Sequence, residues 1–268
     1  MKRIIPVLLI TVLLAAALLS GCTGTSQNQQ APASHAGAAG TSEKTYIIGI
    51  DAEYPPYSYL DPNGTPTGFD VESMRWIAEK KGLKVTFQPT AWDGMIPSMD
   101  AGKIDMVYSG MTITPERAEK VNFSIPYLKI NQSIAVPNSG TKTLDDFYAG
   151  KMVIGAQRGT TGAIWVENNL VNKGLMAKDN LKVYDSFPLV AADLAIGRID
   201  AAVYDKPPMI TAIADKPAHI IGEIDTNEQY GVAIPKSNPA LLQTMNEGLT
   251  ELMKDPYWQV LRNKYALG

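Results

Sequence analysis

The sequence is short of the side chains on which most metal, redox and disulfide chemistry depends. Among 268 residues there is one cysteine, Cys22, and there are two histidines, His35 and His219. A single cysteine excludes an internal disulfide and a zinc site built from several cysteines. Two histidines so far apart in the chain form no metal-ligand cluster. We therefore expect no metal and no other cofactor.

The chain also has no large net charge of either sign. The chain has 24 Lys and Arg residues against 27 Asp and Glu residues, which gives a net charge of −3. This balance disfavours nucleic acid as a partner. A hydrophobic content of 45% with 19% charged residues is typical of a globular protein. The sequence shows no Ser/His/Asp or Cys/His constellation and no Gly-rich phosphate loop.

The N-terminus has the pattern of an export signal. A short positive start is followed by an apolar run, residues 4–19, of the length of a signal-peptide core. Leu19-Ser-Gly-Cys22 then resembles a lipobox, so we predict a signal peptide over residues 1–21, lipidation of Cys22 and a location outside the cytoplasmic membrane. An uncleaved membrane anchor is the alternative. Residues 22–44 are rich in Ser, Thr, Gln, Ala and Gly and indicate a flexible tether.

From residue 45 onward, short apolar runs alternate with amphipathic segments. We predict strands at 46–50, 85–87, 104–108, 153–156, 181–184, 201–203 and 231–234. Predicted helices lie between them, at 70–82, 96–101, 163–173 and 189–196, and a terminal helix begins at Pro239. This alternation predicts parallel α/β layering. The aromatic residues Tyr257, Trp258 and Tyr265 at the end of the chain are expected to pack in the core.

The segment Gly110–Arg117 predicts the end of a strand followed by a helix. Thr114 is a good N-cap, and the proline after it suits the first helical position. A guanidinium at Arg117, beside the free N–H groups of a helix start, would make a good carboxylate receptor. The alternative is that Arg117 pairs with Glu116 or Glu119 on a solvated face.

Polar residues follow the predicted strands in both halves of the chain. They are Asp51–Tyr54, Trp92 and Ser109–Thr112 in the first half, and Gln157–Thr161 and Tyr204–Asp205 in the second. Ligands of open α/β sheets bind beyond the carboxyl ends of the strands. Two such halves facing each other would form a cleft.

Six sequence marks, in order, resemble the polar-amino-acid solute-binding proteins of ABC importers, the bacterial extracellular solute-binding protein family 3. They are Asp51…Tyr54-Pro-Pro-Tyr57, Gly68-Phe-Asp-Val-Glu72, Asp105-Met-Val-Tyr-Ser-Gly110, Thr112-Ile-Thr-Pro-Glu-Arg117, Asn122-Phe-Ser124 and Gln229-Tyr-Gly-Val-Ala-Ile-Pro-Lys236. Ser73 departs from the family, which usually has an apolar residue there. We expect this departure to affect helix packing only.

The resemblance covers residues 45–268 and implies an α/β fold of the two-lobe periplasmic-binding-protein type II. In this fold two hinge strands join the lobes, and the ligand lies in the cleft. By that analogy lobe 1 is discontinuous, residues 45–130 and 231–268, and lobe 2 is residues 131–230. For the hinge strands the sequence itself offers two extended runs, 131–136 and 230–234.

The ligand roles of the family can be carried over residue by residue. Arg117, with the backbone N–H groups of Thr112 and Thr161, resembles the clamp for the ligand α-carboxylate. Asp205 resembles the acceptor for the α-ammonium group, together with the Thr112 hydroxyl and the Gly110 carbonyl. Since these groups lie in different lobes, an amino acid would join both lobes and favour the closed state. The alternative for Asp205 is capping of the helix that follows it.

The resemblance also assigns the pocket for the ligand side chain. Tyr54 and Trp92 match the aromatic pair that sandwiches it, and Asp51 matches the acid at its distal end. Gln157 and Tyr204 occupy positions that vary with specificity among relatives, and Ser109 completes the expected set. As alternatives, Asp51 could bond the backbone of its own Pro-rich loop, and Trp92 could belong to the core.

The net charge of this pocket predicts the charge of the ligand side chain. Its net charge is negative and aromatic faces favour cations, so we expect arginine, lysine, ornithine or histidine. Glutamine is second, because an acid and an amide can also bind a carboxamide. Arg158, in the loop after the strand 153–156, is expected to face solvent, and an inward position would reverse the inference.

Two other classes of function compete with a transport role. Periplasmic dehydratases acting on prephenate or arogenate share the scaffold, but elimination needs a positioned general acid. The residues after Asp205, Lys206-Pro-Pro208, offer no second carboxylic acid. A sensor domain would need a spanning helix, and no apolar stretch follows Tyr265. We therefore expect a monomeric, non-enzymatic binder, tied to the membrane through Cys22, that delivers its ligand to ABC importer membrane subunits.

Overall fold

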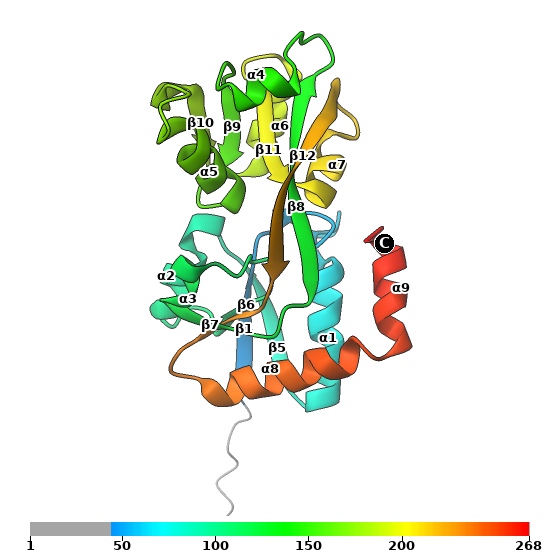
Figure 1. The fold of residues 1–268 in the computed structure, drawn as a ribbon. Coiled ribbons are helices and arrows are strands. Elements are labelled where there is room, and N and C mark those ends of the chain that lie inside the picture. Colours follow the sequence, from blue (N-terminus) through cyan, green and yellow to red (C-terminus); the bar gives the residue numbers. More distant parts are fainter. Residues whose placement is uncertain (1–43, 268) are drawn as a thin grey trace, which may run out of the picture. The chain divides into compact units, whose positions relative to one another are not determined.

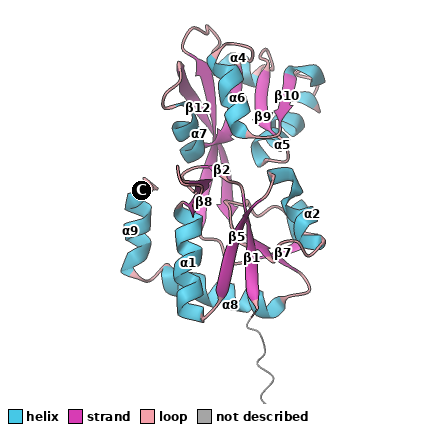
Figure 2. Cartoon of the chain, turned by 180° about the vertical axis from the view of Figure 1, so that it is seen from behind, coloured by secondary structure: helices cyan, strands magenta, loops and turns pink. Residues whose placement is uncertain are grey.

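The computed structural model describes residues 44–267, so the predicted signal peptide and Cys22 lie outside the described residues. The described part contains two five-stranded sheets and a small three-stranded one (Figures 1 and 2). The small sheet is formed by β2 (Glu53–Tyr54), β3 (Ser58–Leu60) and β4 (Pro66–Thr67). No helix among the described residues is long and apolar enough to cross a membrane.

The first large sheet has the strand order β5-β1-β6-β13-β7. Its strands are β1 (Thr45–Ile50), β5 (Lys84–Pro89), β6 (Met106–Val107), β7 (Val121–Phe123) and β13 (Ala233–Pro235). β1 pairs in parallel with both of its neighbours, while β13 is antiparallel to β6 and β7. This sheet therefore combines residues from two distant stretches of sequence.

The helices of this half follow the predicted pattern except the last. They are α1 (Phe69–Lys81), α2 (Met95–Asp100), α3 (Pro115–Ala118), α8 (Pro239–Leu252), α9 (Pro256–Lys264) and the 3-10 turn η1 (Trp92–Gly94). The exception, α9, was not predicted as a separate helix. Gly82 has φ of 64° and ends α1, as predicted. In the core, Phe69 of α1 lies 4.9 Å from the Trp258 ring, and Tyr265 is also buried. Ser73 is buried within α1, at a packing position.

The second large sheet has the order β10-β9-β11-β8-β12. Its strands are β8 (Leu128–Pro137), β9 (Ile154–Gln157), β10 (Leu181–Tyr184), β11 (Ala201–Asp205) and β12 (Ala218–Tyr230). β9 is parallel to β10 and β11, and β8 is antiparallel to β11 and β12. Apolar side chains that include Ile134, Phe147 and Ile154 form its core.

Helices of the second half begin earlier than predicted. They are α4 (Leu144–Tyr148), α5 (Thr161–Val166), α6 (Phe187–Ala195) and α7 (Lys206–Ile213), with η3 (Lys178–Asn180). The Thr160 hydroxyl accepts from the Ala163 N–H at 3.2 Å, so α5 begins at Thr161. The predicted helix 163–173 is in fact the rest of α5 followed by a π-helical turn, η2 (Glu167–Val171).

The strand β12 was not predicted, and the predicted strand 231–234 begins too early. β12 ends at Tyr230, and β13 begins at Ala233. Between them, the Val232 N–H donates to the Ser124 hydroxyl at 2.9 Å. β12 pairs with β8 from Ala218 opposite Pro137 to Tyr230 opposite Leu128, with two register irregularities. Figure 1 shows these two paired strands running between the regions of the two large sheets.

Candidate functional site

Loops from both large sheets converge on one small cavity. Its free volume for a water-sized sphere is about 10 Å³, because the side chains inside it bond to one another. The cavity is lined by Asp51, Tyr54, Trp92, Gly110, Thr112, Arg117, Gln157, Thr160, Thr161, Tyr204 and Asp205. All residues predicted to touch the ligand therefore line it except Ser109, and Thr160 is added.

Ser109 lies behind the cavity rather than in its wall. It is fully buried, and its hydroxyl accepts from the Asp51 N–H at 3.0 Å. The same hydroxyl lies 2.7 Å from the Ser58 hydroxyl, which donates to the Asp51 carbonyl at 2.7 Å. The structure thus gives Ser109 a role in holding the Asp51 loop, through its bonds to the Asp51 N–H and the Ser58 hydroxyl.

Arg117 is held by the single helical turn α3. The Thr114 hydroxyl accepts from the Arg117 N–H at 3.2 Å, which is the predicted N-cap. The guanidinium donates to the carbonyls of Thr112 at 2.8 Å and Gly159 at 3.0 Å, and its carbon lies 5.4 Å from the centre of the Trp92 ring. Burial lowers the pKa of Arg117. Arg117 thus faces the cavity, and the alternative of a pair with an acidic neighbour on the surface is wrong.

Asp205 stands at the end of β11, where α7 begins. Its side chain makes no capping hydrogen bond to α7, so the capping alternative is wrong. Instead its carboxylate accepts from the Tyr54 hydroxyl and from the amide of Gln132. Burial first, and then the negative charge of Glu228, raises the pKa of Asp205 to about 6.

Gly110 gives the backbone room beside these groups. Its φ is 58°, and a Cβ there would lie 2.5 Å from an atom of the Tyr54 ring, so glycine is required. The Gly110 N–H donates to Asp70 at 2.6 Å, and the Tyr127 hydroxyl donates to the same oxygen at 3.0 Å. Complete burial raises the pKa of Asp70 to about 8. The Gly-Phe-Asp mark therefore fixes the loop that lines the cavity.

Two residues of the site were missed in the sequence. Gln132 of β8 and Glu228 of β12 lie on the paired strands that run between the sheets. Glu228 accepts from the Thr112 hydroxyl at 2.8 Å, from the Thr161 hydroxyl at 2.6 Å and from the Gln132 amide at 3.2 Å. The segment Lys206-Pro-Pro208 has no carboxylic acid, as stated from the sequence, and the second carboxyl group near Asp205 comes instead from Glu228 on β12. Extended runs of mixed polarity gave no local signal for either residue.

Asp51 and Gln157 form the far side of the cavity. Asp51 is 8% exposed, and one carboxylate oxygen accepts from the Glu53 N–H at 2.9 Å. The other accepts from the Gln157 amide at 3.1 Å, and the Gln157 carbonyl accepts from the Tyr204 hydroxyl at 2.9 Å. Burial raises the pKa of Asp51. The backbone-bonding alternative for Asp51 therefore accounts for one of its two oxygens.

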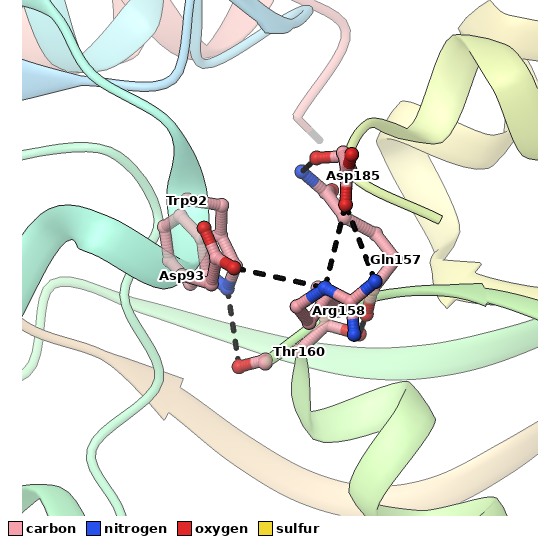
Figure 3. Close-up of polar contacts among 7 residues, drawn as sticks. Trp92, Asp93, Gln157, Arg158, Thr160 and Asp185 are labelled. Atoms are coloured by element: carbon pink, nitrogen blue, oxygen red, sulfur yellow. Dashed lines mark hydrogen bonds and ion pairs between the residues drawn. The ribbon is translucent and has the colours of Figure 1, made fainter. Parts of the chain in front are cut away.

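Trp92 and Arg158 stand at the edge of the cavity, and Figure 3 shows their surroundings. The half-buried Trp92 ring packs against the apolar cluster of Met95, and its N–H donates to the Gly159 carbonyl at 3.1 Å. Trp92 is thus partly core and partly cavity wall. The Arg158 side chain is 51% exposed and pairs with Asp185 at 3.3 Å and with Asp93 at 3.7 Å. It does not line the cavity.

The arrangement can hold a small molecule that carries both charges. Arg117 supplies a fork of cationic donors, and Asp205 supplies a buried carboxylate on another wall of the same cavity. Thr161 is the first residue of α5, a position where the backbone N–H has no intrahelical acceptor. A zwitterion placed here would find a partner for each charge.

Comparisons with known proteins identify the family of the chain. The sequence profile of the bacterial extracellular solute-binding proteins, family 3, matches residues 46–268. The L-cystine-binding protein TcyJ of Escherichia coli strain K12 is 34% identical over 226 residues, which are 82% of this chain and 82% of that protein.

Two solved proteins are also similar. An ancestral arginine-binding protein, solved with arginine and with glutamine, is 35% identical with a TM-score of 0.74, covering 82% of this chain and 97% of that one. The ancestral amino acid-binding protein AncCDT-1, a precursor of cyclohexadienyl dehydratase, is 35% identical with a TM-score of 0.71, covering 82% of this chain and 94% of that one. The chain belongs to the bacterial extracellular solute-binding proteins, family 3.

Proposed function

We propose that this protein captures an amino acid outside the cytoplasmic membrane and delivers it to an ABC importer. The observation that carries this proposal is the pair of opposite charges in one cavity, Arg117 from the first half and Asp205 from the second. Charges taken out of water need partners, and hydrogen bonds to charged groups contribute about 1.5–3 kcal/mol each. Three or four of them supply about 4.5–12 kcal/mol toward a micromolar complex, which needs about −8 kcal/mol net after association costs.

The cavity then has two ends, which we name by the part of the ligand that each would meet. The α-group end consists of Thr112, Arg117, Thr161, Asp205 and Glu228, and the side-chain end consists of Asp51, Tyr54, Trp92, Gln157 and Tyr204. In the α-group end, Arg117 and the N–H groups of Thr112 and Thr161 would bind the α-carboxylate. Asp205, the Thr112 hydroxyl and the Gly110 carbonyl would bind the α-ammonium group.

The side-chain end favours a cationic ligand: arginine, lysine, ornithine or histidine. Asp51 brings a carboxylate there, and the rings of Tyr54 and Trp92 add faces that attract cations. The structural relative solved with arginine supports this preference, and its complex with glutamine supports the second candidate. L-cystine, named for TcyJ, is a third ligand to be tested.

Ligand capture would close the protein. We infer that lobe 1 is residues 45–130 and 231–268, that lobe 2 is residues 131–230, and that β8 and β12 act as the hinge. A ligand that contacts both lobes favours the closed state by its differential affinity. The closed, monomeric form would then dock on the importer's membrane subunits.

The thermal unfolding midpoint tests the proposed function. The purified protein, unfolded and refolded to remove bound amino acid, is compared with the twenty amino acids, ornithine and L-cystine. A ligand that binds only the folded state raises the midpoint by mass action. We expect the largest shift with arginine, lysine, ornithine or histidine. No shift with any amino acid would refute the proposed function, and a shift with glutamine or cystine alone would refute only the cationic preference.

We further propose that the protein is a lipoprotein that uses Cys22 as its anchor and is not an enzyme. In C22A the incorporation of labelled fatty acid into the protein should be lost, and unchanged incorporation would contradict the lipid anchor. Glu228 places a second carboxyl group beside Asp205, so dehydration of prephenate deserves a direct assay. We expect no turnover above the background rate, and clear turnover would replace the binding role with an enzymatic one.

A further inference from the structure

Glu228 joins both sheets at the α-group end of the cavity. Thr112 follows β6 of the first sheet, and Thr161 begins α5 beside the second sheet. Both hydroxyl groups donate to the same carboxylate oxygen of Glu228, at 2.8 and 2.6 Å. The other carboxylate oxygen accepts from the Gln132 amide at 3.2 Å. Glu228 is therefore bonded to three side chains, and two of these, Thr112 and Thr161, line the cavity.

These bonds fix the direction of the two hydroxyl groups. A hydroxyl has one proton, and an ionised carboxylate can only accept hydrogen bonds. Thr112 and Thr161 therefore both give their protons to Glu228. The Thr161 oxygen in turn lies 3.3 Å from the Gln132 amide, as its acceptor. The Thr112 oxygen keeps its lone pairs for a donor in the cavity.

We propose that Glu228 is a positioning residue of this receptor, which turns the Thr112 hydroxyl into an acceptor and so selects ligands that carry an α-ammonium group. The inference deepens the proposed function and rests on it. An ammonium group has three donors and no acceptor, so it needs several acceptors at once. Asp205 and the Gly110 carbonyl supply two, and the Thr112 oxygen supplies the third. Without Glu228 the Thr112 proton is free to point into the cavity, toward the ammonium group.

The charge of Glu228 acts in the same direction. It lies close enough to Asp205 to raise the pKa of that carboxyl group and to favour the charged form of Arg117. Two carboxylates around one cation leave a negative excess where the ammonium group would lie. A ligand that lacks this group would leave the excess uncompensated. Glu228 therefore favours ligands that carry an α-ammonium group over ligands that lack it.

The test compares E228Q with the wild-type full chain, purified in detergent, on two pairs of ligands. One pair is arginine and 5-guanidinopentanoic acid, and the other is glutamine and 4-carbamoylbutanoic acid; in each pair the second molecule lacks only the α-ammonium group. The matched control is E223Q, the same substitution on the same strand, since Glu223 is exposed and pairs with Lys206. Dissociation constants are measured by calorimetry.

We expect E228Q to weaken the amino acid about tenfold or more, which corresponds to one hydrogen bond to a charged group. The des-amino analogue should change less than about twofold on the same argument, and E223Q should change neither ligand. In a T112V background the effect of E228Q should become clearly smaller, because the hydroxyl contribution is gone and only the charge of Glu228 remains to be lost.

Three outcomes would overturn the proposal. Equal weakening of both members of a pair would show that Glu228 only supports the fold or the closure of the protein. Unchanged or tighter binding of the amino acid would show that Glu228 merely occupies the place of the ligand. An effect of the same size in the T112V background would show that it does not act through Thr112. If the wild-type protein binds neither arginine nor glutamine, the pair is formed from the amino acid with the largest thermal shift and its des-amino analogue. If no amino acid binds, the proposed function is refuted and this inference with it.

Discussion

The two ends of the cavity are built in different ways. At the α-group end, ionised groups come from three separate elements, α3 for Arg117, β11 for Asp205 and β12 for Glu228. At the side-chain end, a single acid, Asp51, is held by the amide of Gln157 and by its own loop. The first end requires one fixed pattern of charge on the ligand. In the described part of the chain, Asp51 and Gln157 make no hydrogen bond to Arg117, Asp205 or Glu228, so specificity can change at these two positions, whereas Tyr54 donates to Asp205 and is tied to the first end.

Substitution of Arg117 should cause the largest loss of affinity. A small loss would contradict the difference between the two ends of the cavity. In R117A the ligand carboxylate loses its cationic partner, and we expect affinity to fall about 100-fold or more for every amino acid. R117K should recover only part of this loss, because an ammonium group cannot make the paired contacts of the guanidinium fork. Calorimetry with arginine and glutamine measures both. A loss of less than about tenfold in R117A would mean that the α-carboxylate lies elsewhere.

The pH dependence of binding should also arise at the α-group end. In the free protein the pKa of Asp205 is raised to about 6, and an ammonium ligand requires the ionised carboxylate. The proton therefore competes with the ligand, and affinity should fall as the pH drops through 6, by up to about tenfold per pH unit below it. Above about pH 7 the affinity should be nearly constant as far as Asp205 is concerned.

Calorimetry between pH 5 and pH 8 measures this effect, and D205N is its control. The asparagine variant should bind more weakly at pH 7 and lose most of the dependence. The pKa of Asp51 is raised as well, so D51N serves to separate the two groups. A wild-type affinity that is the same at pH 5 and pH 7.5 would contradict the role of Asp205.

At the side-chain end, D51N should weaken the binding of arginine more than the binding of glutamine. Arginine would lose an ionised partner, and we expect about a tenfold weaker complex. Glutamine needs only a hydrogen bond there, so its dissociation constant should change by less than about threefold. The ratio of the two constants is the readout. An equal loss for both ligands would show that Asp51 supports the loop rather than the ligand side chain.

The sequence could predict the features that have a local signal in the chain. The alternation of strands and helices gave the α/β class, and α1 ends at Gly82 as expected. Arg117 and Asp205 each stand beside a local signal, a helix start or a strand end, and the resemblance to the family then assigned their roles. Local signals of this kind depend only on neighbours in the chain.

Glu228 and Gln132 had no such signal. Each lies inside a long strand, and its meaning depends on the pairing of β8 with β12. That pairing is set by contacts across many residues of sequence, which composition and periodicity do not reveal. β12 itself was missed for the same reason, since its exposed and half-exposed residues give no continuous apolar run. Ser109 was assigned to the cavity because a strand end does not determine which way a buried hydroxyl points.

Substitution of Arg158 should change the affinity least. It tests where the side-chain end of the cavity stops. Its guanidinium pairs with Asp185 and Asp93, and all three side chains are about half exposed or more. Ion pairs at such exposure contribute little, about 0–1 kcal/mol, and salt weakens them further. We therefore expect R158A to change the affinity for arginine by about twofold or less, with a smaller difference still at 0.5 M salt. Since Asp93 and Arg158 belong to opposite halves, a larger loss that is equal for arginine and glutamine would mean that the pair helps to hold the closed state. A gain for arginine alone would mean that the positive charge of Arg158 is felt inside the cavity, and the side-chain end would then extend to the rim.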